Sequence, residues 1–257
     1  RAQRETCFAR GIEIMGGGSV DLSGKLVLVT GATRGIGRAV AIAAAAAGAE
    51  LIITGRTVGA LEEADDAIRA AGGRSTMVEL DMKDTPAISR LAAAIAGRWE
   101  RLDGFVANAA MLPALTPVTH LTPEAWDESV AVNLTGQWHM IRVLDPLLRA
   151  SPAGRAVLVT SGAAVGNRPF WGPYAATKAA LEAVGRSWAG ESEQTNLRIN
   201  MLNPGGTATK MRASAFPGEN PETLPSPEDI APAFLALLAT DCTHHGELVD
   251  ARAMLGL

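Results

Sequence analysis

From Lys25 onward, short runs rich in β-branched residues alternate with longer alanine-rich stretches of helical character. This alternation is typical of a parallel sheet, because parallel strands need crossover connections that are usually helices. We therefore predict an α/β fold with a doubly wound, seven-stranded parallel sheet covered by helices on both faces. The expected strands are Leu26–Thr30, Glu50–Thr54, Thr76–Leu80, Gly104–Asn108, Ala156–Ser161, Ile199–Leu202 and Glu247–Val249.

The rest of the chain is expected to form helices and one long loop within a single domain, residues 21–257, because no repeat or linker interrupts it. Residues 1–20 carry charges and a Gly-Gly-Gly stretch without an apolar core, and we expect a disordered extension there. The segment Gly205–Pro225 is too long for a plain connector and is predicted to be a lid over a crevice at the sheet. The expected helices are Ile36–Ala47, Val58–Ala71, Pro86–Trp99, Pro123–Leu148, Trp171–Gln194 and Pro227–Ala239.

Charge, apolar runs and cysteines exclude several classes of protein. The formal net charge of −4 argues against nucleic-acid binding, which normally needs a basic face. The apolar run Ala39–Ala47 is too short to span a membrane. Cys7 and Cys242 lie far apart without redox or metal spacing, which favours a reducing, cytoplasmic location. His244 and His245 lack companion ligands, so we predict a solvated loop there and no metal site.

A glycine-rich turn follows the first predicted strand and opens the first predicted helix, in Thr30-Gly31-Ala32-Thr33-Arg34-Gly35-Ile36-Gly37. Glycines let such a turn approach a pyrophosphate closely, while free N–H groups of the helix face its negative charge. The motif alone also fits an ordinary tight turn. Its position between a strand and a helix favours a Rossmann-like dinucleotide site.

The end of the second predicted strand indicates which dinucleotide the site accepts. An acidic residue there would bind a ribose 2′-hydroxyl, whereas an arginine pairs with a 2′-phosphate. The sequence has Arg56 at this place and Arg34 in the glycine turn. We expect NADP(H) rather than NAD(H); the alternative is that both arginines are only solvated.

Three side chains form a candidate acid–base set. Tyr174 is the only tyrosine, and Lys178 follows it four residues later on the same predicted helical face. An ammonium near a phenol favours the phenolate, so we expect Lys178 to lower the pKa of Tyr174 toward working pH. Ser161 ends a buried-looking strand and is able to donate to a carbonyl oxygen. Each pattern alone is a frequent accident, but together with the glycine turn they favour catalysis.

With these motifs in place, the chain resembles the short-chain dehydrogenase/reductase family in its compact single-domain form, from about Leu22 to Ala251. The catalytic set that the resemblance implies is Asn133, Ser161, Tyr174 and Lys178. The cofactor-binding set that it implies, together with the glycine turn and arginines above, is Gly31, Thr33, Arg34, Gly35, Ile36, Gly37, Arg56, Asp81, Met82, Asn108, Ala109, Tyr174, Lys178, Pro204, Gly205, Thr207 and Thr209.

The resemblance implies a hydride transfer between nicotinamide C4 and a carbonyl or alcohol carbon. Tyr174 would exchange the proton, Ser161 would orient the carbonyl, Lys178 would hold the nicotinamide ribose, and Asn133 would position a relay water. The cofactor supplies the redox chemistry and the protein supplies positioning. A different class of function stays open: an NADP(H)-binding redox or ligand sensor on the same fold, without turnover.

Two departures from the family pattern concern the cofactor loop and the C-terminus. Ala110 replaces a usual glycine in Asn-Ala-Gly, and Val249-Asp250-Ala251 replaces a common Asp-Gly-Gly. The first bears on cofactor fit and the second on the pocket or subunit interface. The segment Met211–Pro217 resembles the lid of a poorly characterised bacterial subgroup of the family.

The predicted mouth of the site is apolar, which bears on substrate and partners. Its residues either pack the loops or contact a moderately hydrophobic ketone, aldehyde or oxoacyl compound. The family resemblance also implies a homodimer or homotetramer formed through 125–148 and 174–188. The residues expected at the mouth are Val165, Asn167, Phe170, Trp171, Met211 and Phe216.

Overall fold

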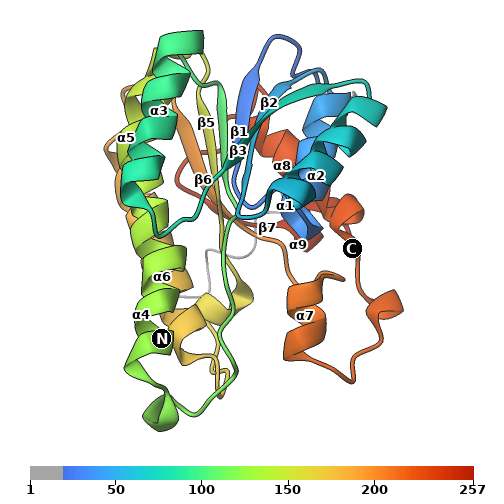
Figure 1. Cartoon of the computed structure of the whole chain (residues 1–257), viewed down its shortest axis with the longest axis vertical. Helices are drawn as coiled ribbons and strands as arrows, with labels where there is room; N and C mark the ends of the chain where they lie inside the picture. The colour runs from blue at the N-terminus through green and yellow to red at the C-terminus, as the bar shows by residue number, and fades with distance from the viewer. Residues whose placement is uncertain (1–19) are drawn as a thin grey trace.

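The computed structural model describes residues 20–257, which form one seven-stranded, all-parallel sheet (Figure 1). The strand order is β3-β2-β1-β4-β5-β6-β7, so the chain starts inside the sheet and winds outward in both directions. This confirms the predicted Rossmann-like fold class. The strands are β1 (Leu26–Val29), β2 (Glu50–Gly55), β3 (Arg74–Glu79), β4 (Gly104–Ala107), β5 (Arg155–Val159), β6 (Arg198–Asn203) and β7 (Leu248–Asp250).

The winding direction reverses between β1 and β4, which are hydrogen-bonded neighbours. Leu28 of β1 pairs with Ile52 of β2 on one side and with Phe105 of β4 on the other, and all three side chains are buried. In a doubly wound sheet, ligands bind outside the carboxyl ends of the strands at this reversal. The structure therefore places the candidate site at the end of the sheet near the loops that follow β1, β2, β4 and β5.

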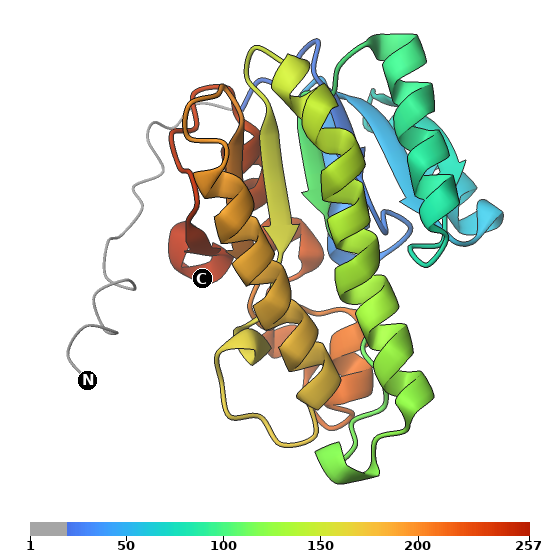
Figure 2. The same cartoon turned by 90° about the vertical axis from the view of Figure 1, so that its left-hand side faces the viewer.

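Helices cover both faces of the sheet, and each face has its own apolar core. The helices α1, α2 and α8 pack on one face, while α3, α5 and α6 cover the other, as Figures 1 and 2 show. The helices are α1 (Gly35–Ala46), α2 (Val58–Ala70), α3 (Thr85–Trp99), α4 (Pro123–Val130), α5 (Gly136–Ala150), α6 (Gly172–Gly190), α7 (Lys210–Ala215), α8 (Pro227–Leu238) and α9 (Ala251–Leu255).

The helix predicted over Pro123–Leu148 is not continuous. Its first and last segments are α4 and α5, and one π-helical turn, η2 (Ala131–Thr135), joins them. Gly136 begins α5 against the loop after β3, where an added Cβ would lie 2.3 Å from the Met82 carbonyl oxygen. The helix predicted over Trp171–Gln194 is shorter in the structure, where α6 ends at Gly190.

The lid, predicted as a loop over Gly205–Pro225, contains the short helix α7. The Thr209 hydroxyl caps it by accepting from the N–H of Arg212 at 3.2 Å. The C-terminal helix α9 was also missed, although the Asp250 carboxylate caps it by accepting from the N–H of Ala253 at 3.0 Å. Three single 3-10 turns complete the described elements: η1 (Val118–His120), η3 (Gly162–Ala164) and η4 (Pro221–Thr223).

The predicted extension, residues 1–20, lies outside the described residues except for Val20, which is partly buried and packs against the core. Cys7 lies outside them too. No helix within residues 20–257 is long and apolar enough to cross a bilayer. The same residues contain no group of three or more His, Cys, Asp or Glu side chains able to hold a metal ion.

The prediction of a solvated loop at the two adjacent histidines was wrong for one of them. His245 is partly buried, and its Nδ1 accepts from the Ile199 N–H at 3.2 Å. Its Nε2 lies 2.9 Å from the Ala189 carbonyl oxygen. His245 therefore joins the ends of β6 and α6, whereas the His244 ring contacts the Glu247 carboxylate near the surface.

Candidate active site

The glycine-rich turn lies between β1 and α1 as predicted. Gly31 and Gly35 have φ of +65° and +55°, the left-handed region that favours glycine. Gly37 lacks space for any side chain: an added Cβ would lie 2.4 Å from Asn108 Nδ2 and 2.5 Å from the Gly31 carbonyl oxygen. The residue before α1, Arg34, makes no side-chain capping bond, so the first N–H groups of the helix are left for another partner. This cradle fits a pyrophosphate.

Thr30 joins the ends of the two central strands, although the sequence analysis gave it no role. Its hydroxyl oxygen accepts from the N–H groups of Asn108 and Ala109, both at 3.0 Å. The Asn108 side-chain amide donates back to the Thr30 carbonyl at 2.8 Å. Asn108 therefore fixes the loop after β4 beside the glycine turn. The signal in the sequence was a hydroxyl residue at the last position of a buried strand.

The two arginines predicted to select the dinucleotide lie at the same edge of the sheet. Arg56 directly follows β2, and the end of that strand touches the glycine turn, because a Cβ on Gly55 would lie 2.4 Å from Thr33 Cγ2. Both Arg34 and Arg56 are exposed. None of the ion pairs within residues 20–257 uses either guanidinium. They are available to an anion that reaches the ends of β1 and β2.

The remaining predicted cofactor residues border this edge from two sides. Asp81 and Met82 follow β3; the Asp81 carboxylate accepts from the Lys83 N–H at 2.9 Å, and Met82 is buried. Across the crevice, the lid begins against the glycine turn, since a Cβ on Gly35 would lie 3.5 Å from Thr209 Cγ2. Within the segment that leads into the lid, Thr207 is buried and Gly205 has a φ of +72°. Pro204 is buried as well, and Ile36 is partly buried at the start of α1.

The predicted acid–base residues meet between β5 and α6. Tyr174 and Lys178 lie one turn apart near the start of α6, and both are buried. Lys178 Nζ donates to the Val159 carbonyl at the end of β5 at 2.7 Å and lies 5.7 Å from the centroid of the Tyr174 ring. Ser161, two residues beyond Val159, lies close enough to the Tyr174 phenol to lower its pKa. A phenol, an ammonium and a hydroxyl therefore share one small volume.

The predicted lowering of the pKa of Tyr174 by Lys178 was wrong for the protein chain by itself. Burial raises the pKa of Tyr174 to about 12, and the neighbouring Ser161 hydroxyl has a smaller, opposite effect on that pKa. Burial also lowers the pKa of Lys178 to about 8, against the opposing effect of the Glu182 negative charge. Desolvation dominates because both groups lie almost entirely out of contact with water. At neutral pH the site therefore holds a protonated phenol.

Because Tyr174 is the only phenol in the chain, its ionisation is expected to be measurable directly by ultraviolet titration. The folded protein should develop phenolate absorbance near pH 12, and the denatured chain near pH 10. The pKa is raised in the folded state, so its contribution to stability is present below about pH 10 and is lost progressively as the pH rises above that. A folded-state titration near 10 would contradict the buried position of the phenol.

Asn133 lies in the π-helical turn η2, and its side-chain amide is fully engaged within the protein. The amide oxygen accepts from the Met111 N–H at 2.8 Å. The amide nitrogen donates to the Met111 carbonyl at 2.9 Å and to the Thr177 hydroxyl at 3.3 Å. Asn133 therefore ties the loop after β4 to α6, and its side chain is not free to hold a water.

Aromatic residues form a wall beside the phenol. The Trp171 ring meets the Tyr174 ring edge to face with 5.8 Å between centroids. The centroid of the Phe216 ring, in the lid, also lies 5.8 Å from that of Trp171. The Arg212 guanidinium covers Phe216 at 3.8 Å and pairs with the Glu219 carboxylate. We name Tyr174, Trp171, Phe216 and Arg212 the aromatic stack. It links the buried phenol of Tyr174 to the lid.

The other residues predicted at the mouth of the site differ in how far they are buried. Val165, Asn167 and Phe170 are exposed, whereas Met211 is partly buried. Phe170 has a φ of +75°, which is strained for a residue with a side chain, and its carbonyl accepts from the Thr116 N–H at 3.2 Å. Of the mouth residues described, only Asn167 is polar, so the prediction of an apolar mouth stays a prediction.

The family model for short chain dehydrogenases matches residues 25–220, which hold the glycine turn, the Thr30–Asn108 junction and the phenol–ammonium pair. The chain is a short-chain dehydrogenase. It is an oxidoreductase of that family. This confirms the resemblance drawn from the motifs and their spacing.

Known proteins place this short-chain dehydrogenase in a little-characterised bacterial group, as its lid sequence predicted. The uncharacterised oxidoreductase YciK of Escherichia coli is 38% identical over 223 residues, which are 86% of this chain and 88% of that protein. A short chain dehydrogenase of Escherichia coli complexed with NADPH is 36% identical with a TM-score of 0.87, covering 91% of this chain and 99% of the other. One from Shigella flexneri complexed with NADP has the same identity and TM-score over 91% and 100%.

The second departure from the family pattern has a structural outcome in this short-chain dehydrogenase. The Asp250 carboxylate accepts from the Asn203 side-chain amide at 3.2 Å, besides capping α9. Ala251 and Met254 then return to the core against α8. The C-terminal residues therefore support β6 and β7 next to the site. Ala110, the other departure, is partly buried in the loop after β4.

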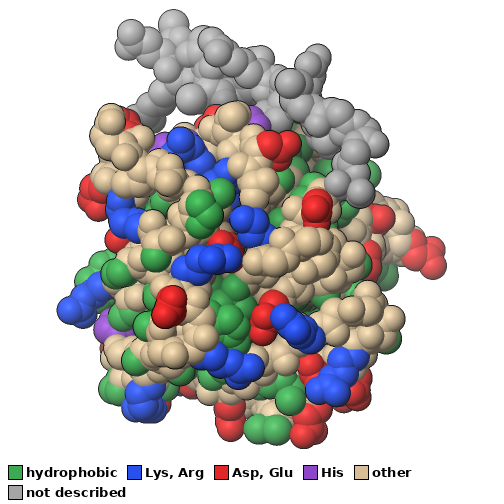
Figure 3. All heavy atoms as spheres, turned by 90° about the horizontal axis from the view of Figure 1, so that it is seen from above, with side chains coloured by type: hydrophobic (Ala, Val, Ile, Leu, Met, Phe, Trp, Pro, Cys, Tyr) green, Lys and Arg blue, Asp and Glu red, His purple; other side chains and the backbone are tan. Residues whose placement is uncertain are grey.

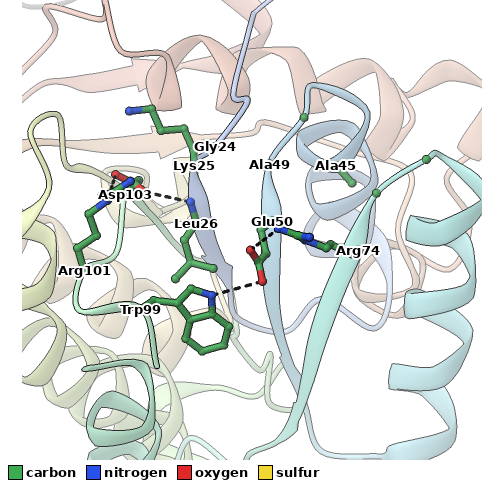
Figure 4. A pocket seen from close by; sticks show the side chains of 13 residues that line it. Gly24, Lys25, Leu26, Ala45, Ala49, Glu50, Arg74, Trp99, Arg101 and Asp103 are labelled. Atoms are coloured by element: carbon green, nitrogen blue, oxygen red, sulfur yellow. Dashed lines mark hydrogen bonds and ion pairs between the residues drawn. The ribbon is translucent and has the colours of Figure 1, made fainter. Parts of the chain in front are cut away.

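A hollow of about 550 Å³ lies at the amino ends of the strands, opposite the phenol–ammonium pair. Four of its charged side chains are paired: Glu50 accepts from Arg74 and from the Trp99 indole, and Asp103 contacts Arg101 (Figure 4). Seen from this end, acidic and basic side chains are interspersed (Figure 3). This hollow brings together no phenol, ammonium and hydroxyl of the kind found at the other end of the sheet, so its size alone does not make it the candidate site. The hollow beside Ser161 is smaller, about 20 Å³.

Proposed function

We propose that this short-chain dehydrogenase transfers a hydride between NADP(H) and a carbonyl or alcohol substrate, with Tyr174 as general acid and base. The observation that carries this proposal is the convergence of Tyr174, Lys178 and Ser161 at the carboxyl end of β5. A buried phenol within reach of an ammonium and a hydroxyl is suited to proton exchange with a carbonyl oxygen.

The residues divide the work as follows. Bound NADP(H) supplies or accepts the hydride. Tyr174, protonated at neutral pH, donates its proton to the substrate oxygen, and Ser161 orients that oxygen. Lys178 keeps a positive charge beside the phenol. Because the pKa of Tyr174 is raised, the site is better prepared for carbonyl reduction than for alcohol oxidation at neutral pH.

The preference for NADP(H) rests on Arg34 and Arg56, which flank the ends of β1 and β2 without partners among the described ion pairs. Two relatives described above were obtained as complexes with NADP or NADPH. Glycine-turn residues would hold the pyrophosphate, and Asp81 would contact the adenine. Thr207 and Thr209 would lie along the nicotinamide.

Arg56→Ala is expected to weaken NADPH binding about tenfold to a hundredfold, because a charge-assisted contact with the 2′-phosphate is lost. Binding of NADH, which lacks that phosphate, should change little. Fluorescence titration with both cofactors measures the difference. Arg90→Ala, on the exposed side of α3, is the control. Unchanged NADPH affinity in Arg56→Ala would mean that the assigned 2′-phosphate site is wrong.

Turnover is tested by following loss of NADPH with a panel of ketones, aldehydes and oxoacyl compounds. The apolar mouth formed by Trp171, Phe216 and Met211 favours moderately hydrophobic members of the panel. NADPH binding without oxidation across a broad panel would overturn the catalytic proposal and support the sensor.

We further propose that the protein is a homo-oligomer that pairs through α4, α5 and α6. Two tryptophans on this side are open to solvent in the single chain: Trp126 of α4 is 43% exposed and Trp138 of α5 is 46% exposed. Large aromatic rings are typical of interface centres. A second copy of the chain would bury them.

Trp138→Glu is therefore expected to shift the protein toward monomers, since a carboxylate in the centre of an apolar interface is costly. Sedimentation velocity at several concentrations measures the change. The exposed Val58→Glu on α2, on the opposite face of the sheet, is the control. An unchanged sedimentation coefficient for Trp138→Glu would exclude this interface.

A further inference from the structure

The end of β5 engages one face of α6 through three successive residues. The Val159 carbonyl accepts from Lys178 Nζ at 2.7 Å. The Thr160 hydroxyl donates to Glu182 Oε1 at 2.6 Å. Ser161 acts on the Tyr174 phenol. The three partners on α6 are spaced four residues apart, so they share one helical face.

Glu182 is the member of this row that the proposed mechanism has not used. Its residue is only 4% exposed. Besides Thr160 it has one further partner, the exposed Arg186 guanidinium, at 3.5 Å. A buried carboxylate is costly unless it has charged or hydrogen-bonding partners. A single neutral hydroxyl and a solvent-exposed arginine satisfy it only in part.

Lys178 is a buried ammonium that lacks a negatively charged hydrogen-bond partner among the described residues. It is 1% exposed, and a neutral carbonyl is its hydrogen-bond acceptor. Burial lowers the pKa of Lys178 to about 8, and the negative charge of Glu182, one turn further along α6, is the influence that raises it. The two side chains form no direct ion pair among the described residues, so the attraction acts through space.

Other charged or titratable groups near this pair come from α6 itself and from β7. Tyr174 lies on α6 itself, and Arg186 closes the row toward solvent. Asp250 of β7 lines the small hollow that Ser161 and Glu182 also line. The end of β5 contributes Val159, Thr160 and Ser161, none of which is charged. Glu182 is therefore the carboxylate on the face that Lys178 occupies.

We propose that Glu182 is a positioning residue: held to β5 by Thr160, its carboxylate keeps the buried Lys178 ammonium charged and directed at the Val159 carbonyl beside Tyr174. Its catalytic meaning rests on the proposed function, whereas the charge coupling is present without turnover. The row Tyr174, Lys178 and Glu182 then works as one unit against three successive residues of β5.

Glu182→Gln tests the coupling, because it keeps the shape and the acceptor for Thr160 but removes the charge. At about pH 6.5 the ammonium is protonated in the folded and unfolded states, so the variant loses the full attraction. At about pH 9.5 the ammonium of the folded variant has deprotonated, so less attraction is left to lose. The fall in Tm relative to the parent protein should therefore be largest at the lower pH and shrink as the pH rises.

Two further variants separate this coupling from simple packing. In a Lys178→Met background, Glu182→Gln should no longer lower Tm at either pH, because its charged partner is gone. Glu193→Gln removes an exposed carboxylate just after α6 and should leave Tm unchanged throughout. A fall in Tm that is independent of pH and persists in the Lys178→Met background would overturn the proposal.

Should Glu182→Gln not fold, Thr160→Val carries the same test by releasing the carboxylate from β5. A pH-dependent fall in Tm that Thr160→Ser restores supports the proposal, and a pH-independent fall opposes it.

With an active carbonyl substrate, the alkaline limb of kcat/KM in Glu182→Gln should move to lower pH by about one unit. An unmoved limb in that assay would also count against it. Absence of turnover in the parent protein would overturn the proposed function and leave the Tm measurements to decide this inference.

Discussion

Tyr174→Phe is expected to lower kcat for carbonyl reduction roughly a thousandfold, the largest loss from any single substitution in this protein. The variant loses the only phenol hydroxyl in the chain, and no other acid is positioned by the described contacts beside Ser161. The aromatic ring stays, so its edge-to-face contact with Trp171 and its packing in α6 should persist.

The control for this prediction lies within the same variant. NADPH affinity and Tm should remain close to those of the parent protein, because the lost hydroxyl is the only chemical change. Ser187→Ala removes an exposed hydroxyl from the same helix and should leave kcat unchanged. If Tyr174→Phe retained turnover, the proton would have to come from another group and the acid–base assignment would fail.

Gly37→Ala is expected to destabilise the fold by at least about 2 kcal/mol and to weaken NADPH binding more than about tenfold. One methyl would enter a space where the Gly31 carbonyl oxygen lies 2.5 Å away and Asn108 Nδ2 lies 2.4 Å away. The first is backbone, and the second already holds Thr30, so neither neighbour gives way cheaply. Separation of β1 from α1 would follow, and the N–H cradle would lose its shape.

Thermal unfolding and NADPH titration measure both effects. A loss of this size corresponds to about 4–8 °C in Tm for a domain of this length. The matched control is Gly97→Ala on α3, where the added methyl meets open space and should raise stability by about 0.5–1 kcal/mol. Equal behaviour of the two variants would show that close approach at Gly37 has no role.

Most of the architecture could be predicted because its causes are local. The alternation of β-branched and alanine-rich segments predicts the seven strands and the helical crossovers between them. The glycine turn predicts where the first strand ends and the first helix begins. The junction of α4 and α5 could not be predicted, because the π-helical turn at Ala131–Thr135 depends on how Gly136 meets the Met82 carbonyl from a distant loop. Helices α7 and α9 were missed because both are short, although each begins with a capping side chain.

For the candidate site, the sequence predicts which residues come together but not their pKa values or all of their partners. The grouping of Tyr174, Lys178 and Ser161 could be predicted from spacing. Tyr174 and Lys178 lie about one helical turn apart, and Ser161 follows a strand whose carboxyl end lies at the same edge of the sheet. The direction of the pKa of Tyr174 was wrong, because it depends on how much of the ring is buried, a property of the whole fold. Thr30 and Glu182 were overlooked for the same reason: their partners, Asn108 and Thr160, come from other elements.

The aromatic stack has a kinetic consequence. The ion pair between Arg212 and Glu219 joins the two sides of the lid segment that carries Phe216. We therefore expect Phe216 and this segment to move together. A ligand that entered beside Trp171 would have to separate the Trp171 and Phe216 rings, whose centroids lie 5.8 Å apart, and a departing product would have to separate them again. On that route, the frequency with which the rings separate would limit how quickly a product leaves, and its residence time would depend on Phe216 as well as on the ligand.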